Sequence, residues 1–440
     1  MLKRKIMSEG AAPPAMAAAP VELGAMARAT AAREGGWQLS ISEHKRPQPK
    51  PVASVDASCI GNMERSLRVC VLNDTLIRFK FNVDTFEANA KRNMARWKEE
   101  CKAKNCARAS TQGVEVIVEQ GDILETTMKH TQADATLYAA INMANARFPG
   151  GGYTSGCAAQ EENMARRTNL HFTFDADTIL HDGTDIVYND TMRKLIGGED
   201  GRVYLSTDPL ICIKGREIRS KLHVVCGYEL LGEDEIFPFL ELRTAAVNVR
   251  SIMDQNFCRP WNPKLLAANE WAVLDSAQKD VIFAKSAHDA AELEFSSAKG
   301  SASSRLLRAA WKAAQEAQDG LKQAQDRLRS AKDVLILAKM KKRIRAQFLT
   351  LKERGVKHVV FSAFGCGAFG NDAHKVASLY KEVIAEFSDD LDKVVFAIYF
   401  AGHGMSNYEI FRAVLLGASA PPVEDSRTRE ARWASMNCEE

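Results

Sequence analysis

Two apolar runs near the end of the chain, separated by an amphipathic stretch, constrain the fold more than any other feature. HVVFSAF (358–364) and KVVFAIYFA (393–401) have the length and the β-branched content of buried strands. Between them, DAHKVASLYKEVIAEF (372–387) has the apolar periodicity of a helix. Because a helical crossover joins strands that run in the same direction, this segment predicts a mostly parallel sheet covered by helices.

The same alternation occurs earlier in the chain. The pattern predicts an amphipathic helix over 84–104, a strand at VEVIVE (114–119) and a buried strand at LYAAINMA (137–144). Two shorter strands, VYLS (203–206) and LHVVCGYEL (222–230), follow. We therefore predict an α/β fold with a mostly parallel sheet that is covered by helices.

Residues 262–345 carry a different pattern, in which large residues recur at heptad spacing and an alanine follows each of them three positions later. The large residues are Leu274, Val281, His288, Phe295, Leu321, Leu328 and Leu335. Such heptads predict two closely packed helices, inserted into the α/β domain as an antiparallel hairpin. A stabilising insertion is the favoured role. The alternatives are an arm for a protein partner or for self-association, and a surface that faces the substrate.

Several bases follow the second run of heptads. They are Lys339, Lys341, Lys342, Arg343 and Arg345. A solvated, charged helix face accounts for these bases as well as a binding role does.

The composition argues against several classes of protein. The chain has 440 residues, and 59 Lys and Arg against 56 Asp and Glu leave a net charge of +3, which does not indicate a binder of polyanions by bulk charge. The 10 cysteines form no CxxC pair and the 9 histidines form no HExxH motif, so the sequence supports neither a zinc site nor a disulfide framework. No apolar run reaches the ~18 residues that a membrane span requires.

Both ends of the chain differ from the middle. Residues 1–60 are rich in Ala and Pro and lack periodicity, which is typical of a disordered tail, and we expect a flexible tail over 421–440. The start, MLKRKIM, is similar to an organelle transit peptide, but Glu9, Glu22 and Glu34 argue against this because such peptides avoid acidic residues. We expect a cytoplasmic or nuclear protein, with organelle targeting as the alternative.

A glycine-rich loop followed by acidic residues is the first candidate site. The polar end of a predicted strand, NMAN (142–145), leads to GGG (150–152), and QEE (160–162) then opens a predicted helix. Consecutive glycines allow positive φ and a close approach of the backbone to a ligand. Adjacent carboxylates beside such a loop suit glycosidic chemistry, whereas a bare acidic pair is usually a helix N-terminus stabilised by its dipole.

The second candidate site is FGCGAFGN (364–371), between a predicted strand and a helix. Its backbone N–H groups, with the helix N-terminus behind them, suit a diphosphate. The loop also matches GxGxxG, which raises a Rossmann dinucleotide site. Against this, the unit lies at the end of the fold, and the next strand is not followed by an acidic ribose ligand. No GK[ST] follows, which excludes a P-loop.

Together these motifs resemble the microbial-type poly(ADP-ribose) glycohydrolases. The resemblance rests on GGG, seven residues and QEE after an asparagine-rich strand, followed far downstream by FGCGAFGN. The ending KVVFAIYFAGHGMSNYEIFRAVL is similar to the last strand and helix of that family, and the resemblance covers roughly 75–260 and 345–415. It implies a single α/β domain with a macrodomain-like fold, a three-layer α/β/α sandwich with a mixed sheet. It also implies hydrolysis of the ribose–ribose O-glycosidic bond to release ADP-ribose.

The resemblance also implies roles for individual residues. Glu162 is the expected acid/base, Glu161 and Asn145 are expected to hold the ribose, and Asp122 is expected to bind adenine. The other substrate-binding positions that it implies are Gly150, Gly151, Gly152, Gln160, Gly365, Cys366, Gly367, Ala368, Phe369, Gly370 and Asn371. It implies neither a metal nor a cofactor.

These observations predict how the chain is organised and what it acts on. The macrodomain-like domain is expected in two parts, 65–261 and 346–420, around the hairpin. Its partners would be poly(ADP-ribose) or ADP-ribosylated proteins. The alternatives are a hydrolase of mono-ADP-ribosyl bonds and a non-catalytic reader of ADP-ribose. The presence of both glutamates argues against the reader, because binding alone does not require Glu162.

Overall fold

A seven-stranded sheet organises the part of the chain that the computed structural model describes, residues 57–104, 113–183, 185–220, 224–249, 268–299, 303–399 and 406–417. The strand order is β1-β11-β10-β2-β9-β5, with β6 also paired to β9. These strands are β1 (Glu115–Gln120), β2 (Ala139–Met143), β5 (Tyr204–Leu205), β6 (Leu210–Cys212), β9 (Phe237–Thr244), β10 (His358–Phe361) and β11 (Lys393–Ile398). No helix in the described ranges is long and apolar enough for a bilayer span.

Within the sheet, β1, β11, β10, β2 and β9 are each parallel to the strand beside them. β5 and β6 run antiparallel to β9. The predicted mixed, mostly parallel sheet is therefore confirmed. Two antiparallel hairpins lie outside this sheet: β3 (Ile179–Asp182) with β4 (Asp185–Tyr188), and β7 (Lys214–Arg219) with β8 (Val225–Leu230). The segment predicted as the strand LHVVCGYEL contributes to the second of these hairpins.

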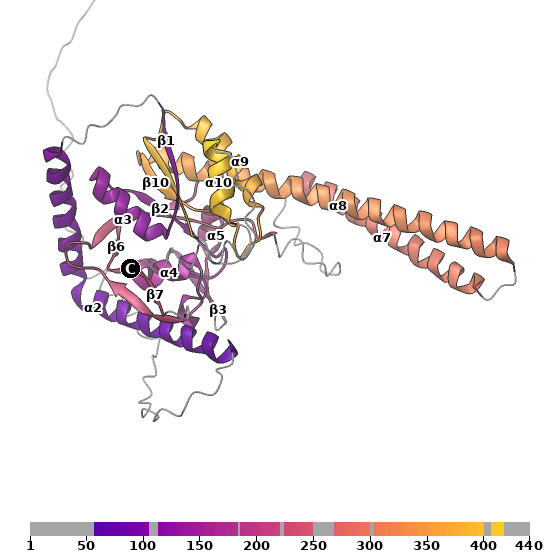
Figure 1. The fold of residues 1–440 in the computed structure, drawn as a ribbon, viewed down its shortest axis with the longest axis horizontal. Helices are drawn as coiled ribbons and strands as arrows, with labels where there is room; N and C mark the ends of the chain where they lie inside the picture. Colours follow the sequence, from indigo (N-terminus) through magenta and orange to yellow (C-terminus); the bar gives the residue numbers. More distant parts are fainter. Residues whose placement is uncertain are drawn as a thin grey trace, which may run out of the picture. The chain divides into compact units, whose positions relative to one another are not determined.

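Helices cover the sheet in two groups. The first group is α2 (Ala57–Ala103), α3 (Ile123–Asp134) and α4 (Gln160–Arg167), and the second is α8 (Ser304–Glu353), α9 (Ala373–Glu386) and α10 (Asn407–Leu416). The remaining helices are α5 (Asp190–Ile196), α7 (Ala268–Ala298) and the short 3₁₀ turns η1 (Tyr153–Ser155) and η2 (Asn169–Thr173). Within each group the helices contact one another as well as the strands, which gives the predicted layers (Figure 1).

Helix α2 is longer than the sequence predicts. It begins at Ala57, inside the predicted tail, and its two halves join across Asn82, which has non-helical φ and ψ. The first half was missed because it buries the polar side chains of Arg68 and Thr75 alongside Leu72 and gives no clean apolar periodicity. The rest of the predicted N-terminal tail and the predicted C-terminal tail, 421–440, lie outside the described residues.

Aromatic side chains dominate the core between the sheet and the second group of helices. Phe348 of α8 stacks on Phe361 of β10, with 5.2 Å between the ring centroids, and also packs against Tyr380 of α9. Tyr380 in turn meets Phe396 of β11 edge to face, with ring centroids 5.0 Å apart. These rings are fully buried, so α8 is an integral part of the sandwich.

The two long helices α7 and α8 pack against each other along the predicted heptad positions. Leu274 and Val281 of α7 form a separate small core with Ala324, Leu328 and Leu335 of α8. The predicted hairpin is therefore present. Its role in binding a partner or in self-association stays a prediction.

Helix α8 continues without a break from the hairpin into the α/β domain. Its next buried residues, Ile336, Met340 and Ile344, belong to the main core. The packing of α8 thus changes after Leu335, before the boundary expected at 345. The heptad pattern does not reveal this change, because the helical period is the same on both sides.

Most of the bases that follow the heptads are engaged inside the domain. Lys341 Nζ lies 2.8 Å from Glu382 Oε2, and Arg345 Nε lies 2.7 Å from Glu386 Oε2, so two turns of α8 are tied to α9. Arg343, which is half-buried, donates from Nη1 to the carbonyl of Ala245 at 2.6 Å. These contacts favour the interpretation of a charged helix face over a binding role.

Truncation of Phe348 tests whether α8 is integral to the sandwich. We expect Phe348→Ala to lower the free energy of unfolding by about 3–5 kcal/mol, the usual cost of removing a fully buried aromatic side chain. Leu328→Ala, in the small core of the hairpin, is the control and leaves the unfolding of the α/β domain unchanged. Denaturant titration followed by tryptophan fluorescence measures both, and equal losses in the two variants would contradict the separation of the two cores.

Candidate functional site

Three neighbouring parallel strands bring the candidate site together. β10, β2 and β9 lie side by side and run in the same direction, so the segments that follow them leave from one edge of the sheet. These segments contain the GGG loop (150–152), the FGCGAFGN loop (364–371) and residues 245–249. Open α/β sheets bind ligands at this edge. Two motifs far apart in the sequence thus become neighbours.

Gln160 joins the start of α4 to the end of β2. Its Oε1 accepts from the backbone N–H of Met143 at 2.8 Å, and its Nε2 donates to the carbonyl of Ile141 at 2.9 Å. Both ends of the amide are therefore used by the strand. The structure gives Gln160 a positioning role, because this pairing places the next two residues of α4 beside the glycine loop.

Glu161 is fully buried and is held by backbone donors. Its Oε2 accepts from the N–H of Asn145 at 2.7 Å, and its Oε1 accepts from the N–H of Gly150 at 3.1 Å. Burial raises the pKa of Glu161 well above its usual range, the N–H of Asn145 opposes this rise, and the negative charge of Glu162 adds to it.

Glu162 has one carboxylate oxygen engaged and one available. Its Oε1 accepts from the N–H of Gly152 at 2.9 Å. Its Oε2 is buried and has no hydrogen-bond partner among the described residues. Of the four carboxylate oxygens of Glu161 and Glu162, three thus bind backbone N–H groups, and the fourth has no partner among the described residues.

Gly151 allows the backbone of the glycine loop to lie close to the carboxylates of Glu161 and Glu162. Its φ is +58°, and a Cβ added to it would lie 2.4 Å from Glu162 Oε1 and 3.1 Å from Glu161 Oε2. Gly150 is constrained similarly, because its φ is +73° and an added Cβ would lie 2.7 Å from the ring of Tyr153. Close approach, and not only flexibility, requires glycine at these two positions.

Asn145 shapes the turn that precedes the glycines. Its Oδ1 accepts from the backbone N–H groups of Arg147 at 2.8 Å and Phe148 at 2.9 Å. Tyr153, at the other end of the loop, is buried, and its hydroxyl lies 2.7 Å from Nδ1 of His171. Tyr153 therefore packs within the loop, and Oδ1 of Asn145 is used by the turn. The predicted contact of Asn145 with ribose stays a prediction.

The FGCGAFGN loop is held from within. Asn371 donates from Nδ2 to the carbonyls of Val247 at 2.7 Å and Gly365 at 3.0 Å, and the N–H of Val249 donates to the carbonyl of Phe369 at 3.0 Å. Asn371, predicted to bind substrate, therefore braces the loop. Burial raises the pKa of the Cys366 thiol to about 12, so this thiol is protonated at neutral pH.

The tip of this loop offers donors. In the described part of the chain, the backbone N–H groups of Gly367, Ala368 and Phe369 have no backbone acceptor. Gly367 and Ala368 are exposed, and Phe369 is half-buried beside them. Successive free N–H groups in a loop that leads into a helix are suited to an anion. Within the described ranges, no group of three or more His, Cys, Asp or Glu side chains is placed to hold a metal ion.

Asp122 is the N-cap of α3. Its Oδ1 accepts from the backbone N–H groups of Leu124 at 2.9 Å and Glu125 at 3.1 Å, and also from Nη1 of the buried Arg167 at 2.6 Å. The capping role follows from the helix terminus. Its predicted contact with adenine stays a prediction, for which Oδ2 is the oxygen left.

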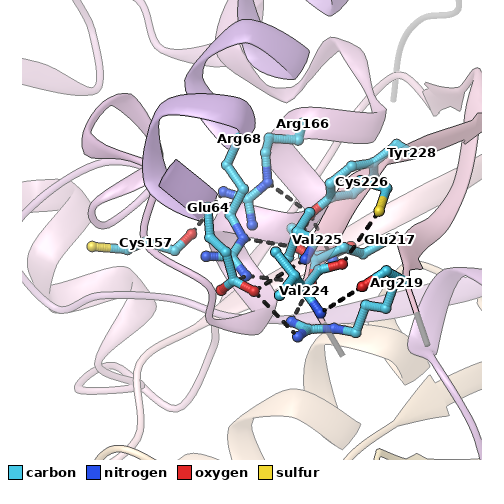
Figure 2. A network of polar contacts seen from close by, with 12 residues as sticks. Glu64, Arg68, Cys157, Arg166, Glu217, Arg219, Val224, Val225, Cys226 and Tyr228 are labelled. Atoms are coloured by element: carbon cyan, nitrogen blue, oxygen red, sulfur yellow. Dashed lines mark hydrogen bonds and ion pairs between the residues drawn. The ribbon is translucent and has the colours of Figure 1, made fainter. Parts of the chain in front are cut away.

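A polar network ties α2 and the β7–β8 hairpin to the end of the glycine loop (Figure 2). Arg166 donates from Nη1 to the carbonyl of Cys157 at 2.7 Å and from Nε to the hydroxyl of Tyr228 at 2.9 Å. Tyr228 donates to Glu217 Oε2 at 3.1 Å, and Arg68 of α2 binds the same oxygen at 2.8 Å. This network holds the loop at the end opposite to its carboxylate contacts.

A buried ion pair next to this site was not predicted from the sequence. Glu241 and Arg243 lie on β9 and are completely buried. Almost every residue of FPFLELRT is buried, as expected of a strand covered on both faces. Had this segment been predicted as an inner strand of the sheet, both of its charged residues would have been expected to be buried.

Comparison with known proteins agrees with the motifs. Residues 75–192 match the model of a family described as "Microbial-type PARG, catalytic domain". The resemblance to microbial-type PARG is confirmed over this segment. The match includes the glycine cluster and both glutamates, whereas the FGCGAFGN loop lies outside it. No curated protein matches the chain.

Solved structures that are similar to the chain include two bacterial enzymes. Poly(ADP-ribose) glycohydrolase from Thermomonospora curvata is 17% identical, with a TM-score of 0.43, and the alignment covers 80% of this chain and 100% of that one. The enzyme from Deinococcus radiodurans, solved in complex with ADP-ribose, is 17% identical, with a TM-score of 0.40 and coverage of 77% and 92%.

A side chain at Gly151 should disturb the carboxylates. We expect Gly151→Ala to lower the Tm by more than Gly183→Ala does. Both positions have positive φ, but an added Cβ meets Glu162 only at Gly151 and has nothing within 4 Å at Gly183. Differential scanning calorimetry measures both variants. If the two variants lose the same amount of Tm, the short distance between Gly151 and Glu162 imposes no steric constraint.

The raised pKa of Glu161 predicts how stability depends on pH. Because the folded state raises this pKa above its unfolded value, the stabilisation is complete below the unfolded pKa and is lost as pH rises through the folded pKa. Glu161→Gln cannot ionise. As the pH is raised from 4.5 to 8, about the range above the unfolded pKa of a glutamate, the Tm of the variant should therefore rise relative to that of wild type. A difference that is independent of pH would contradict the raised pKa.

Proposed function

We propose that this chain is a poly(ADP-ribose) glycohydrolase that cleaves the ribose–ribose O-glycosidic bond and releases ADP-ribose, with Glu162 as the acid/base. The observation that carries the proposal is the state of the two carboxylates. Three oxygens are bound by backbone N–H groups, and the buried Oε2 of Glu162 is left for a reacting atom. The family match over residues 75–192 supports the same chemistry.

The proposed reaction passes protons through Glu162, beside a carboxyl that ionises with difficulty. Burial raises the pKa of Glu161, and the negative charge of Glu162 adds to this rise. In the proposed reaction a proton is delivered from Oε2 of Glu162 to the leaving ribose oxygen. The same oxygen then accepts a proton from the water that attacks the oxocarbenium-like carbon.

The remaining parts of the site hold the substrate in place. Glu161 is fixed by Asn145 and Gly150 and is positioned to bind ribose hydroxyls beside Glu162. The N–H groups at the tip of the second loop, at Gly367 to Phe369, would bind the diphosphate. Binding through N–H donors requires no lysine or arginine at the phosphates, which agrees with the small net charge of the chain.

Loss of the Glu162 carboxylate tests the proposal. Wild-type protein incubated with poly(ADP-ribose) should release free ADP-ribose, identified by mass spectrometry. Glu162→Gln should lower the rate by about 10²–10⁴-fold, the usual contribution of a general acid/base. Glu382→Gln, which alters an exposed carboxylate of α9, is the matched control and should retain the wild-type rate.

Two outcomes would contradict the proposal. One is that wild-type protein binds ADP-ribose but leaves the polymer intact, which would indicate a reader or a hydrolase of another ADP-ribosyl bond. The other is undiminished release of ADP-ribose by Glu162→Gln, which would assign the acid/base to another group.

A further inference from the structure

A cavity of about 280 Å³ lies where the long hairpin joins the α/β domain, and the proposed reaction does not use it. It is lined by α8, by the start of α9 and by Val249, which follows β9. Pockets for drug-sized ligands measure ~300–1,000 Å³. The volume of this cavity therefore suits a ligand the size of one nucleoside, and it is too small for a whole ADP-ribose unit.

The cavity lies at the edge of the sheet that carries the candidate site. α8 ends at Glu353, shortly before β10 begins, and α9 begins at Ala373, after the loop that follows β10. Both helices therefore run back along β10, and the first turn of α9 lies at the site edge. Lys375 in this turn donates from Nζ to Asp333 Oδ2 at 3.2 Å, which places the middle of α8 at the same edge.

The FGCGAFGN loop is shared between the cavity and the proposed diphosphate site. The free N–H groups are at Gly367 to Phe369, and the next residues, Gly370 and Asn371, line the cavity. Val249, also in the lining, donates its N–H to the carbonyl of Phe369 at 3.0 Å. A polymer whose diphosphate is bound by the tip of this loop therefore has the cavity beside it.

Most of the wall of the cavity is aliphatic. The apolar lining residues are Val249, Ile336, Leu337, Met340 and Val376. Both carboxylates in the lining are engaged, because Asp333 binds Lys375 and Asp372 Oδ1 accepts from the backbone N–H of Lys375 at 2.9 Å. The remaining charged residue in the lining is Arg329.

The side chain of Arg329 is a cation at the mouth of the cavity. It is exposed, and it forms no ion pair or hydrogen bond with the described residues. Ile336 follows it by two helical turns on the same face of α8 and is buried in the main core, so this face of the helix is directed toward the domain. The cavity thus combines apolar walls with one cation that has no partner in the described part of the chain.

These groups match the chemistry of a nucleoside diphosphate. A purine buries its flat surface against aliphatic side chains, and a guanidinium binds phosphate oxygens through parallel hydrogen bonds. Every unit of poly(ADP-ribose) contains such a group. A polymer with one unit in the candidate site therefore brings another nucleoside diphosphate close to the cavity.

We propose that this cavity, with Arg329 at its mouth, is a second binding site for poly(ADP-ribose), which holds the nucleoside diphosphate of a unit next to the one that is cleaved. The inference rests on the proposed glycohydrolase function for the identity of the ligand. The second site strengthens binding of the polymer, and the chemical step stays with Glu162.

Steady-state kinetics of the full-length chain on two substrates provide the test. Arg329→Gln should raise the KM for poly(ADP-ribose) about tenfold, the loss expected for one charge-assisted hydrogen bond, with kcat unchanged. The second substrate is a single ADP-ribose with a nitrophenyl group on the anomeric carbon of its distal ribose. Its KM should not change in the variant, because one unit cannot occupy both sites.

The matched control is Arg327→Gln. Arg327 is also exposed and lies on α8, but residues two apart on a helix face different directions, so Arg327 is not part of the lining. This variant removes the same charge and should keep the wild-type KM for both substrates.

A second variant blocks the cavity itself. Leu337 is half-buried in the wall, and Leu337→Trp should fill the space and raise the KM for the polymer while leaving the single-unit substrate unaffected. Circular dichroism checks that this variant folds. If it does not fold, Arg329→Gln decides, because that change alters an exposed side chain.

The outcomes separate this inference from the proposed function. If wild-type protein is active but Arg329→Gln has the polymer KM of Arg327→Gln, or raises the KM for both substrates equally, the second site is overturned and the proposed function stands. If wild-type protein releases no ADP-ribose, the proposed function is wrong. Binding of fluorescently labelled poly(ADP-ribose) then decides the inference: weaker binding by Arg329→Gln than by Arg327→Gln supports it, and equal binding overturns it.

Discussion

Hydrogen bonds from the backbone to two adjacent carboxylates are the interactions on which the candidate site depends. The N–H groups of Asn145, Gly150 and Gly152 hold Glu161 and Glu162, and a Cβ at Gly151 would meet both carboxylates. A buried carboxylate is costly unless it is hydrogen-bonded. Everything that positions these donors therefore contributes to the site: the end of β2, the amide of Gln160, and the network that anchors Cys157.

The same physical constraint links the site to the rest of the fold. β2 lies between β10 and β9, so the glycine loop that follows it has a loop of free N–H groups on one side and a buried ion pair on the other. The loop after β10 is neutral and offers N–H groups to an anion, whereas the interior behind β9 holds charge. α8 and α9 complete the domain, and their ion pairs attach the root of the long hairpin to it.

Particular residues show how far prediction from the sequence succeeded. The strands at 115–120, 139–143, 358–361 and 393–398 and the helix over 373–386 follow from local apolar patterns, and these are encoded by neighbours in the chain. Gln160 and Asn371 were predicted to contact substrate, but their amides bind backbone groups within the site. A motif indicates that a polar residue is needed, and only the three-dimensional partners show whether a ligand or the protein uses it.

By itself the sequence determined the parallel α/β pattern, the heptads of the hairpin, the two glycine loops and the adjacent glutamates, because periodicity and backbone freedom are properties of short segments. Tertiary structure decided which of the four carboxylate oxygens stays available, that Glu241 and Arg243 are buried together, and that α8 leaves the hairpin core after Leu335. These features depend on contacts between segments far apart in the chain. Burial sets the energy of a charge or an unpaired oxygen, and burial exists only once the sheet has assembled.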